Sequence, residues 1–298
     1  MAVSVVINTL NEEHNIARAI KSVKNFADEI IVVDMESHDK TVDIAKKLGA
    51  KVFSHKPMNY VEPARNFAIS KANHEWIFIL DADEEAPSEL LSELKRVVES
   101  DLADFVRIPR KNLIFGKWMM HARWWPDYNI RFFKKNAVTW EDEIHSVPIT
   151  DGRDFNVLDR EELSILHHHY ETIEQYIERM NRYTTIQSQE LLLQDKKITL
   201  KDFIQKPTGE FVSRFFAGEG YKDGIHGLIV SMLQGLSELV VYAKLWQLQG
   251  FKEEHYTLRE VTNTITESQK DINYWKAHAL LTEKSSITNR IKRKFKLQ

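Results

Sequence analysis

The clearest chemical signal in the sequence is a pair of carboxylates two residues apart, Asp81 and Asp83, after the apolar run 76–80. Side chains two apart in an extended segment face the same side, so both carboxylates can point at one ligand or ion. Hard oxygen ligands of this kind suit Mg²⁺ or Mn²⁺, and such ions commonly bind together with phosphate groups. A solvated turn explains the same residues, because Asp is common where strands end.

Three further polar stretches lie beside apolar runs in the first hundred residues. Residues 8–13 and 34–41 follow the first two runs, and residues 62–66 precede the fourth. Each has an ordinary structural explanation, such as a helix N-cap at Asp39 or a surface ion pair at Arg65. Four such stretches in this order are hard to explain as four turns. We therefore interpret them as parts of one site.

The elements that must position these residues alternate between strand and helix. The patterns predict strands at 3–7, 30–33, 51–53 and 76–80, with helices at 11–24, 41–48 and 64–72 between them. Strands separated by helices imply parallel pairing with right-handed crossovers. Ligands of such sheets bind beyond the carboxyl ends of the strands, where the polar stretches lie.

The pattern changes after residue 104. Strands are expected at 105–108, 130–133 and 163–170, and long helices at 173–193 and 221–248. We predict one domain over residues 1–170 and a helical extension over residues 171–298.

Composition narrows the function classes. The chain has 298 residues, a formal net charge of -3 and no cysteine. This charge argues against a nucleic-acid partner, and the lack of cysteine leaves His, Asp and Glu as metal ligands and fits a cytoplasmic location. No signal peptide is expected, and the longest nearly uncharged run, 224–237, is shorter than the ~20 residues of a membrane span.

Taken together, these motifs resemble a known enzyme family. Segments 8–13, 34–41, 64–66 and 81–83 are similar to those of inverting family 2 glycosyltransferases with a GT-A fold, over roughly residues 1–170. Segments 124–128, 167–170, 181–183, 223–227 and 242–246, with Arg131, resemble the lipopolysaccharide-core β-glucosyltransferase subgroup. The resemblance implies a Rossmann-like, mostly parallel sheet with flanking helices and a C-terminal helical extension.

The resemblance also implies roles for particular residues. The nucleotide pocket would contain Thr9, Asn11, Glu12, Asp34, Arg65, Asp81 and Ala82. Within it, Asp34 would hold the base or ribose and Arg65 the diphosphate. Asp81 would contact ribose or metal, and Asp83 would bind Mn²⁺ or Mg²⁺.

Inverting transfer also needs a general base to deprotonate the acceptor hydroxyl. The subgroup commonly has a His-Glu pair at this place, but here His145 is followed by Ser146, and serine is no base at neutral pH. The candidates that remain are Asp142, Glu143 and Asp127.

Three consecutive histidines, 167–169, end the last expected strand. Neutral imidazole is a good ligand for Mn²⁺, and alternation places His167 and His169 on one face. We predict that His167 completes the metal ligands with Asp81 and Asp83, with His145 as the alternative. Packing against the following helix would also explain one of these histidines.

Four tryptophans lie where they could contact a sugar, at positions 118, 124, 125 and 140. Their rings could stack on sugar rings, and core packing explains them equally well. We expect core packing for at least two of them.

The C-terminal part raises the question of a membrane. Segment 227–248 is apolar on most sides, which fits a helix at a membrane interface or one buried in the protein. Segment 284–298 holds six basic residues and no acidic one, with Ile287, Ile291 and Phe295 spaced by four. This pattern favours peripheral contact with an anionic membrane, on the inner face of the cytoplasmic membrane. A disordered basic tail is the alternative.

The sequence therefore predicts metal-dependent inverting transfer of a hexose, with glucose from UDP-glucose as the leading donor, to a glycan or glycolipid acceptor. A sugar nucleotidyltransferase is a weaker alternative, because residues 8–13 lack the glycine and basic residues that would hold a triphosphate. A non-catalytic carbohydrate- or membrane-binding protein is the second alternative, supported by Ser146. Sugar choice depends on pocket shape, so the sequence fixes neither the sugar nor the acceptor, and it does not indicate an oligomeric state.

Overall fold

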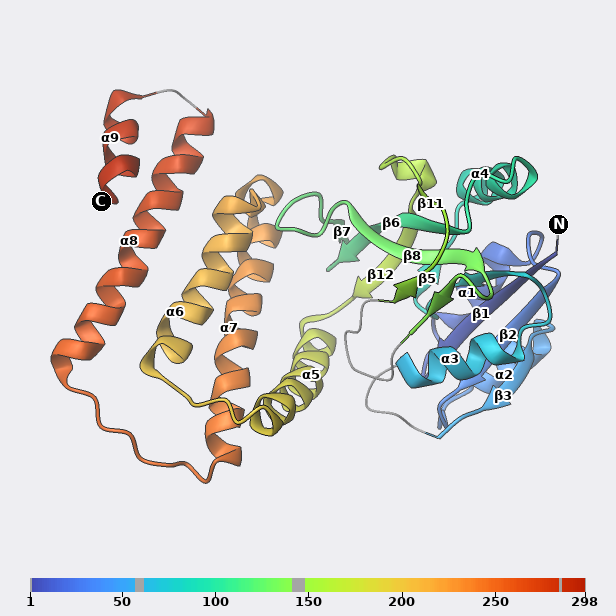
Figure 1. The fold of residues 1–298 in the computed structure, drawn as a ribbon, viewed down its shortest axis with the longest axis horizontal. Helices are drawn as coiled ribbons and strands as arrows, with labels where there is room; N and C mark the ends of the chain where they lie inside the picture. Colours follow the sequence, from blue (N-terminus) through green and yellow to red (C-terminus); the bar gives the residue numbers. More distant parts are fainter. Residues whose placement is uncertain (1, 57–61, 141–147, 284–285, 298) are drawn as a thin grey trace. The chain divides into compact units, whose positions relative to one another are not determined.

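The computed structural model describes residues 2–56, 62–140, 148–283 and 286–297 (Figure 1). The chain forms two compact units. The first contains residues 1–113 and 126–169, and the second contains residues 114–125 and 170–298. Each unit is described by itself below. The predicted division into a catalytic domain over residues 1–170 and an extension over residues 171–298 stays a prediction.

The first unit is built on a mixed sheet with the strand order β3-β2-β1-β4-β8-β6-β12-β5. The first four strands are parallel, and β8 and β6 continue the sheet in antiparallel pairing. Their bounds are β1 Val3–Thr9, β2 Glu29–Asp34, β3 Lys51–Ser54, β4 Trp76–Ile79, β5 Glu84–Glu85, β6 Phe105–Ile114, β8 Asp127–Lys134 and β12 Ile165–Tyr170. The unit also contains the short strand β11 Asp154–Asn156 and a separate two-stranded sheet of β9 Val138–Thr139 and β10 Ile149–Thr150, whereas the short strand β7 Lys117–Trp118 belongs to the second unit. This arrangement confirms the predicted α/β fold.

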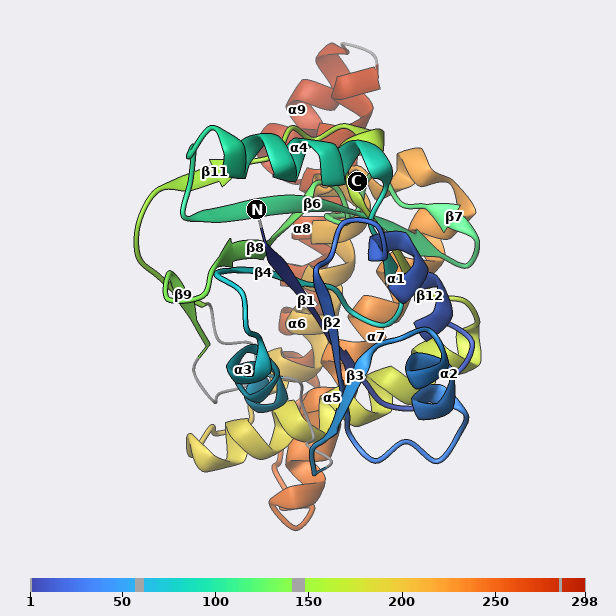
Figure 2. The ribbon, with the colours of Figure 1, turned by 90° about the vertical axis from the view of Figure 1, so that its right-hand side faces the viewer.

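Helices cover both faces of the parallel strands (Figure 2). Side chains alternate along β1, so that Val3, Val5 and Ile7 join one core and Val6 joins the other. Helices α1 (Ile16–Val23), α2 (Thr41–Lys47) and α4 (Ser88–Glu99) pack on the first face, and α3 (Glu62–Lys71) packs on the second.

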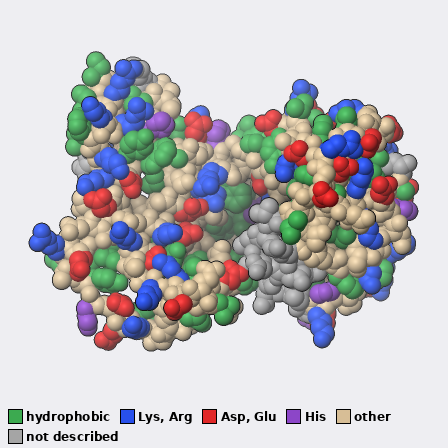
Figure 3. Space-filling view, viewed as in Figure 1, with side chains coloured by type: hydrophobic (Ala, Val, Ile, Leu, Met, Phe, Trp, Pro, Cys, Tyr) green, Lys and Arg blue, Asp and Glu red, His purple; other side chains and the backbone are tan. Residues whose placement is uncertain are grey.

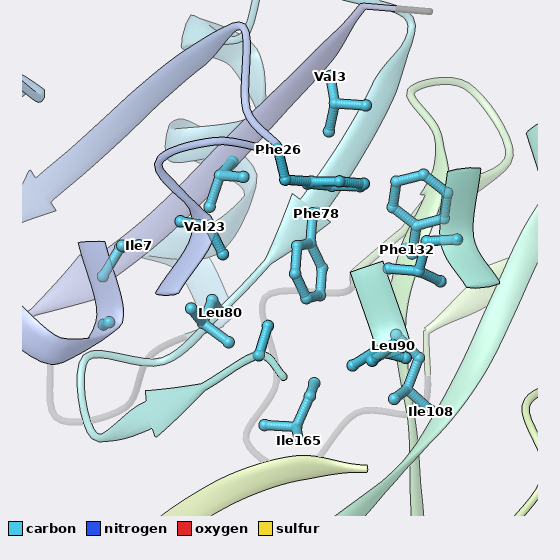
Figure 4. Packing of buried hydrophobic residues seen from close by; sticks show 14 of the residues in the cluster. Val3, Ile7, Val23, Phe26, Phe78, Leu80, Leu90, Ile108, Phe132 and Ile165 are labelled. Carbon is cyan, nitrogen blue, oxygen red and sulfur yellow. The ribbon is translucent and has the colours of Figure 1, made fainter. Parts of the chain in front are cut away.

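The larger core has an aromatic centre. The rings of Trp76 and Phe132 stack with centroids 4.7 Å apart. Phe26 meets Phe78 edge to face at 6.0 Å (Figure 4). This packing fixes β4 and β8 side by side, which places the residues at the ends of these two strands close together.

The predicted helix at 11–24 begins five residues later than expected, at Ile16. Asn11 adopts the left-handed conformation, with φ 55°, and its N–H donates to Ser37 Oγ at 2.8 Å. The N–H of Glu12 donates to Thr41 Oγ1 at 2.8 Å. These backbone groups are therefore used to join two loops rather than to start a helix. The predicted strand at 163–170 likewise begins only at Ile165, after the 3₁₀ turn Glu161–Leu163.

The second unit is helical. Its helices are α5 Ile173–Leu193, α6 Leu200–Val212, α7 Ile225–Leu248, α8 Leu258–Glu283 and α9 Ile287–Phe295, with a π turn at Ser213–Ala217 and a 3₁₀ turn at Gly220–Asp223. The helix predicted from residue 221 is interrupted at Gly224, which has φ 65° and ψ -138°. Only a residue without a side chain adopts this backbone readily, so the chain turns there before α7 begins.

Among the described residues, α7 alone is long and apolar enough to cross a membrane, with a mean hydropathy of 1.4 in its most apolar window. The expectation that no segment reaches this length was therefore wrong. The finding is weak evidence for a span, because the core helix of a soluble protein passes the same test. Polar contacts tie α7 to α5 within the unit: Gln234 Nε2 donates to the Tyr176 hydroxyl at 2.8 Å, and Lys244 Nζ to Asn181 Oδ1 at 2.7 Å.

A buried carboxylate holds the amino-terminal edge of the sheet together. Glu29 accepts hydrogen bonds from Ser4 Oγ at 2.6 Å, from the Asn73 N–H at 2.6 Å and from Lys51 Nζ at 2.9 Å. Burial by itself raises the pKa of Glu29, but these donors outweigh it and lower the pKa from 4.5 to about 2. The ionised carboxylate is thus the form that the fold stabilises.

We expect Glu29→Gln to lower the free energy of unfolding by about 1–3 kcal/mol at neutral pH, because it removes a charged acceptor. The folded pKa of Glu29 lies below its ordinary value, so its contribution is present above pH 4.5 and is lost as the pH falls toward about 2. Urea unfolding at a series of pH values checks this. An equal loss of stability at pH 7 and at pH 2 would contradict the assignment.

Candidate active site

Buried polar atoms without partners mark the carboxyl ends of β1 and β2. Thr9 and Asp34 are paired across the two strands, and Asn8 precedes Thr9. Among the described residues, no hydrogen bond reaches the Asn8 amide, Thr9 Oγ1 or Asp34 Oδ1, and all of these atoms are buried. Buried polar groups in folded proteins are nearly always paired, so these atoms fit a polar ligand that both donates and accepts.

Two other residues predicted for the nucleotide pocket shape the loops around it. Asn11 Oδ1 accepts from the His38 N–H at 2.9 Å, and Glu12 Oε2 accepts from Asn15 Nδ2 at 2.7 Å. The first bond connects the loops that follow β1 and β2, and the second lies within the loop that follows β1. Direct contact of Asn11 and Glu12 with a nucleotide stays a prediction.

Asp81, just past the end of β4, is held by two arginines. Arg131 Nη2 donates to Asp81 Oδ2 at 2.5 Å, and Arg65 Nη2 lies 3.4 Å from Asp81 Oδ1. Burial alone would raise the pKa of Asp81, but Arg131 and Arg65 lower it far below its ordinary value. Asp81 is therefore an ionised partner of the arginines.

Arg131 also forms an ion pair with a second carboxylate, Glu84, which is buried. Its Nη2 lies 2.8 Å from Glu84 Oε1, and Arg110 Nη1 approaches the same oxygen at 3.3 Å. Arg131 and Glu84 are 4% and 0% exposed, so this pair is shielded from water. Although burial lowers the pKa of Arg131, Asp81 and Glu84 raise it above its ordinary value. Charged side chains from the segment after β4 and from β5, β6 and β8 thus form one network of ion pairs.

Asp83 and His167 face one another within this unit. The distance between Asp83 Oδ1 and His167 Nε2 is 3.6 Å, and both residues are buried. His167 Nδ1 lies 2.7 Å from Asn112 Oδ1, and His169 Nδ1 lies 3.2 Å from His167 Nε2. Because a carbonyl oxygen only accepts, His167 Nδ1 donates to Asn112, and Nε2 is the ring nitrogen that faces Asp83 and His169.

This geometry suits two of the three predicted metal ligands. Asp83 and His167 are close enough to touch one ion, and the bond from Asn112 is the kind of support that orients a ligating histidine. Asp81 is occupied by Arg131, and the described residues contain no group of three or more His, Asp or Glu side chains that could hold a metal. The predicted set of three is therefore not assembled. A Mg²⁺-type site often has one or two protein ligands, with water and substrate phosphates completing it.

Asp127, one candidate for the general base, is already engaged. Its Oδ2 accepts from Arg110 Nε at 2.9 Å, from Arg110 Nη2 at 2.6 Å and from Asn112 Nδ2 at 3.1 Å, and its Oδ1 accepts from Asn129 Nδ2 at 3.2 Å. Burial raises the pKa of Asp127, but Arg110 and the two amides outweigh it and lower the pKa. A lowered pKa makes a carboxylate a weaker base. The other candidates, Asp142 and Glu143, lie outside the described residues, as do His145 and Ser146.

The tryptophans separate into different surroundings. Trp140 is buried in the smaller core of the first unit, where Arg65 lies 5.7 Å from its ring centre. In the second unit, Trp124 packs against a small core with Ile114 and Val230. Trp118 and Trp125, also in the second unit, form an edge-to-face pair with centroids 5.1 Å apart. Core packing thus accounts for Trp140 and Trp124, as expected for two of the four.

Sequence reasoning missed Glu84, Arg110 and Asn112, and it used Arg131 only as part of a resemblance. One signal was available: Arg110 and Asn112 are two apart on a strand, so they face the same side, and both contact Asp127. Nothing in the sequence indicates that Glu84 and Asp81 share one arginine.

Comparison with known proteins identifies the family to which the chain belongs. Residues 4–153 match the family described as glycosyl transferase family 2. An uncharacterized glycosyltransferase RT0209 of Rickettsia typhi is 33% identical over 255 residues, which cover 83% of this chain and 87% of the relative. The lipopolysaccharide core biosynthesis glycosyltransferase LpsC of Rhizobium meliloti is 24% identical, over 85% of this chain and 94% of that protein.

Solved structures show weaker likeness. The structure of S. aureus TarS 1-349 in complex with UDP-GlcNAc has a TM-score of 0.46 and 17% identity, over 96% of this chain and 93% of that one. Glucosyl-3-phosphoglycerate synthase of Mycobacterium tuberculosis with Mn²⁺ and UDP-glucose has a TM-score of 0.32 and 25% identity, over 39% and 44%.

The chain belongs to glycosyl transferase family 2. It is therefore a transferase enzyme, as the sequence predicts, and this membership favours sugar transfer over the non-catalytic and nucleotidyltransferase alternatives.

We expect Arg131→Met to lower the free energy of unfolding by about 3–5 kcal/mol, because it leaves the buried Glu84 and the partly buried Asp81 with only the longer contacts to Arg110 and Arg65. Arg107→Met is the matched control on the same sheet: the Arg107–Asp154 pair is 37% and 54% exposed, so solvent screens it and its loss changes little. Urea unfolding of both variants checks this. Equal effects at the two positions would contradict the role given to Arg131.

Proposed function

We propose that this enzyme transfers a hexose, with inversion, from a UDP-sugar to a glycan or glycolipid acceptor of the lipopolysaccharide-core type, with the help of a divalent cation. Glucose is the leading donor sugar. The observation that carries the proposal is the set of unpartnered buried atoms on Asn8, Thr9 and Asp34, in the same unit as the Asp83–His167 pair. The relative LpsC supports the acceptor class, since its name places it in lipopolysaccharide core biosynthesis.

The donor fits these residues by chemistry. Uracil and ribose both donate and accept hydrogen bonds, which is what an amide, a hydroxyl and a carboxylate oxygen can satisfy together. Arg65 is the proposed diphosphate ligand. Its side chain is 14% exposed, and its 3.4 Å contact with Asp81 is longer than the usual 2.7–2.9 Å of a charge-assisted bond. A phosphate can therefore compete for the guanidinium.

Asp83 and His167 are the proposed metal ligands, and Asp81 is reassigned as the residue that orients Arg65 and Arg131. A bound Mn²⁺ or Mg²⁺ would stabilise negative charge on the departing nucleotide diphosphate. Asn112 Oδ1 accepts a hydrogen bond from His167 Nδ1, which would leave the other ring nitrogen, Nε2, to bind the ion. His169 Nδ1 lies 3.2 Å from the same nitrogen, so an ion bound there would replace this contact.

The acceptor hydroxyl must lose its proton as its oxygen attacks the anomeric carbon. Asp127 is poorly suited to this step, since Arg110 and Asn112 hold its carboxylate in the ionised form. We therefore rank Asp142 and Glu143 ahead of it. Asp127 instead positions Asn112, which in turn orients His167.

Release of UDP from UDP-glucose in the presence of a lipopolysaccharide-core acceptor tests the proposal. Asp83→Ala should lower this rate by at least about a hundredfold, because it removes a ligand of the ion that stabilises the leaving group. Chelation with EDTA should have a similar effect, and Mn²⁺ should restore the wild type. The control is Asp154→Ala, which removes an exposed carboxylate of the same unit and should leave the rate unchanged.

Full activity of the wild type in EDTA would refute the metal assignment. Transfer from another nucleotide sugar at a much higher rate would refute glucose as the donor and leave the assignment of the site intact.

We also propose peripheral contact with an anionic membrane through α9. Its apolar side chains are exposed, with Ile287 at 77%, Ile291 at 49% and Phe295 at 60%. Arg290, Lys292, Arg293 and Lys294 lie on the same short helix. Figure 3 shows apolar and basic side chains together at this end of the helical unit. An exposed apolar stripe flanked by cations matches the boundary of an anionic leaflet.

The variant Lys292→Gln with Lys294→Gln should weaken binding to vesicles of phosphatidylglycerol and phosphatidylcholine about thirtyfold, since each cation contributes about 1 kcal/mol. Lys46→Gln with Lys47→Gln, on α2, removes the same charge from another exposed helix and serves as the control. Vesicle cosedimentation measures both. Equal binding of the two variants would show that α9 is not the contact.

A further inference from the structure

The helical unit contains a pocket that lies wholly within it. The pocket has a volume of about 860 Å³ and is formed by the end of α5, the start of α6, the end of α7 and the two linkers that follow α5 and α7. Figure 1 shows the course of these helices and linkers. This volume lies in the range of small-molecule sites, about 300–1,000 Å³. All of its lining residues come from the second unit.

Aromatic side chains form much of its wall. Phe203, Trp246 and Tyr256 line it, and Trp246 and Tyr256 are 40% and 39% exposed. Trp246 is fixed in place: its Nε1 donates to the Lys252 carbonyl at 2.9 Å, and its ring meets Phe251 edge to face at 5.0 Å. The indole therefore presents a rigid, partly exposed apolar surface.

Charged groups of both signs share the lining. Asp195 and Glu254 supply carboxylates, and Lys197 and Lys252 supply ammonium groups, with Lys252 Nζ 4.0 Å from Glu254 Oε1. Lys196, also in the lining, is paired with Asp202 at 3.1 Å. A hydrogen bond from Gln249 Nε2 to the Lys196 carbonyl, at 2.9 Å, connects the two linkers that line the pocket.

This lining restricts the ligand class. Ammonium groups and carboxylates are both present, so the pocket is not matched to an ion of one sign, and a long acyl chain would have to lie against charged groups, which is costly. A sugar ring avoids both problems, because its C–H face packs on aromatic rings and its hydroxyls donate to carboxylates and accept from ammonium groups. The pocket thus matches a neutral, polyhydroxylated ligand.

We propose that this pocket binds carbohydrate, with a sugar of the acceptor glycan as its ligand. The inference rests on the proposed function for the identity of the acceptor. Trp246 supplies the stacking surface, and Asp195 and Glu254 accept from hydroxyls.

The test measures binding of one probe by titration calorimetry: lipid-free core oligosaccharide released from Rhizobium meliloti lipopolysaccharide. Trp246→Ala should weaken its binding by about tenfold or more, as truncation of a central tryptophan commonly does. Trp275→Ala, on α8 and outside the pocket lining, is the matched control and should change the affinity less than about twofold. Affinity for UDP should be the same in all three proteins.

A second variant guards against misfolding of Trp246→Ala. Asp195→Asn with Glu254→Gln keeps the shape of the lining and should also weaken oligosaccharide binding. Unchanged binding in this variant and in Trp246→Ala would overturn the inference, as would a wild type that does not bind the oligosaccharide or that binds laurate in its place. If the oligosaccharide binds as expected but no sugar is transferred to it, the proposed function fails and the carbohydrate pocket stands.

Discussion

The site depends on one buried cation, Arg131, which lies between two carboxylates of a tight turn. Asp81 and Glu84 belong to the same turn, in which the Glu84 N–H donates to the Asp81 carbonyl at 3.0 Å and Glu84 Oε2 accepts from the Asp81 N–H at 2.9 Å. Two carboxylates this close repel each other strongly when they are shielded from water. Arg131, on β8, removes that repulsion and at the same time fastens the turn to the neighbouring strand. Asp83 lies within this turn, so its position follows from the same ion pairs.

This arrangement separates the roles of two carboxylates that look equivalent in sequence. The neighbouring arginines stabilise the ionised form of Asp81, and Asp81 keeps Arg65 near the carboxyl end of β4. Asp83 is turned toward His167, on β12. A chain of contacts from Asp127 through Asn112 then sets the ring orientation of His167. The network thus connects the proposed diphosphate contact to the proposed metal ligands through side chains that never need to touch the donor.

Much of the first unit could be predicted from the sequence, because its core strands are continuous apolar runs and its helices have one apolar face. The Asp81-Ala-Asp83 motif, Asp34 and Thr9 were found because polar residues that follow buried strands are conspicuous. The break at Gly224 was not predicted, since the apolar pattern continues across it and only the backbone conformation reveals the turn. Glu84, Arg110 and Asn112 were missed for a different reason. Their roles come from pairing between strands distant in sequence; the spacing of Arg110 and Asn112 indicates that they share a face but not what they contact.

The central claim is that the unpartnered atoms at the ends of β1 and β2 and the Asp83–His167 pair belong to one donor site. A crystal structure of the enzyme with UDP and Mn²⁺, with anomalous scattering to locate the metal, tests this most directly. The account predicts the uridine against Asn8, Thr9 and Asp34, the diphosphate at Arg65, and the anomalous peak beside Asp83 and His167. An anomalous peak on Asp81 with Arg131 displaced, or uridine bound away from Asp34, would contradict it.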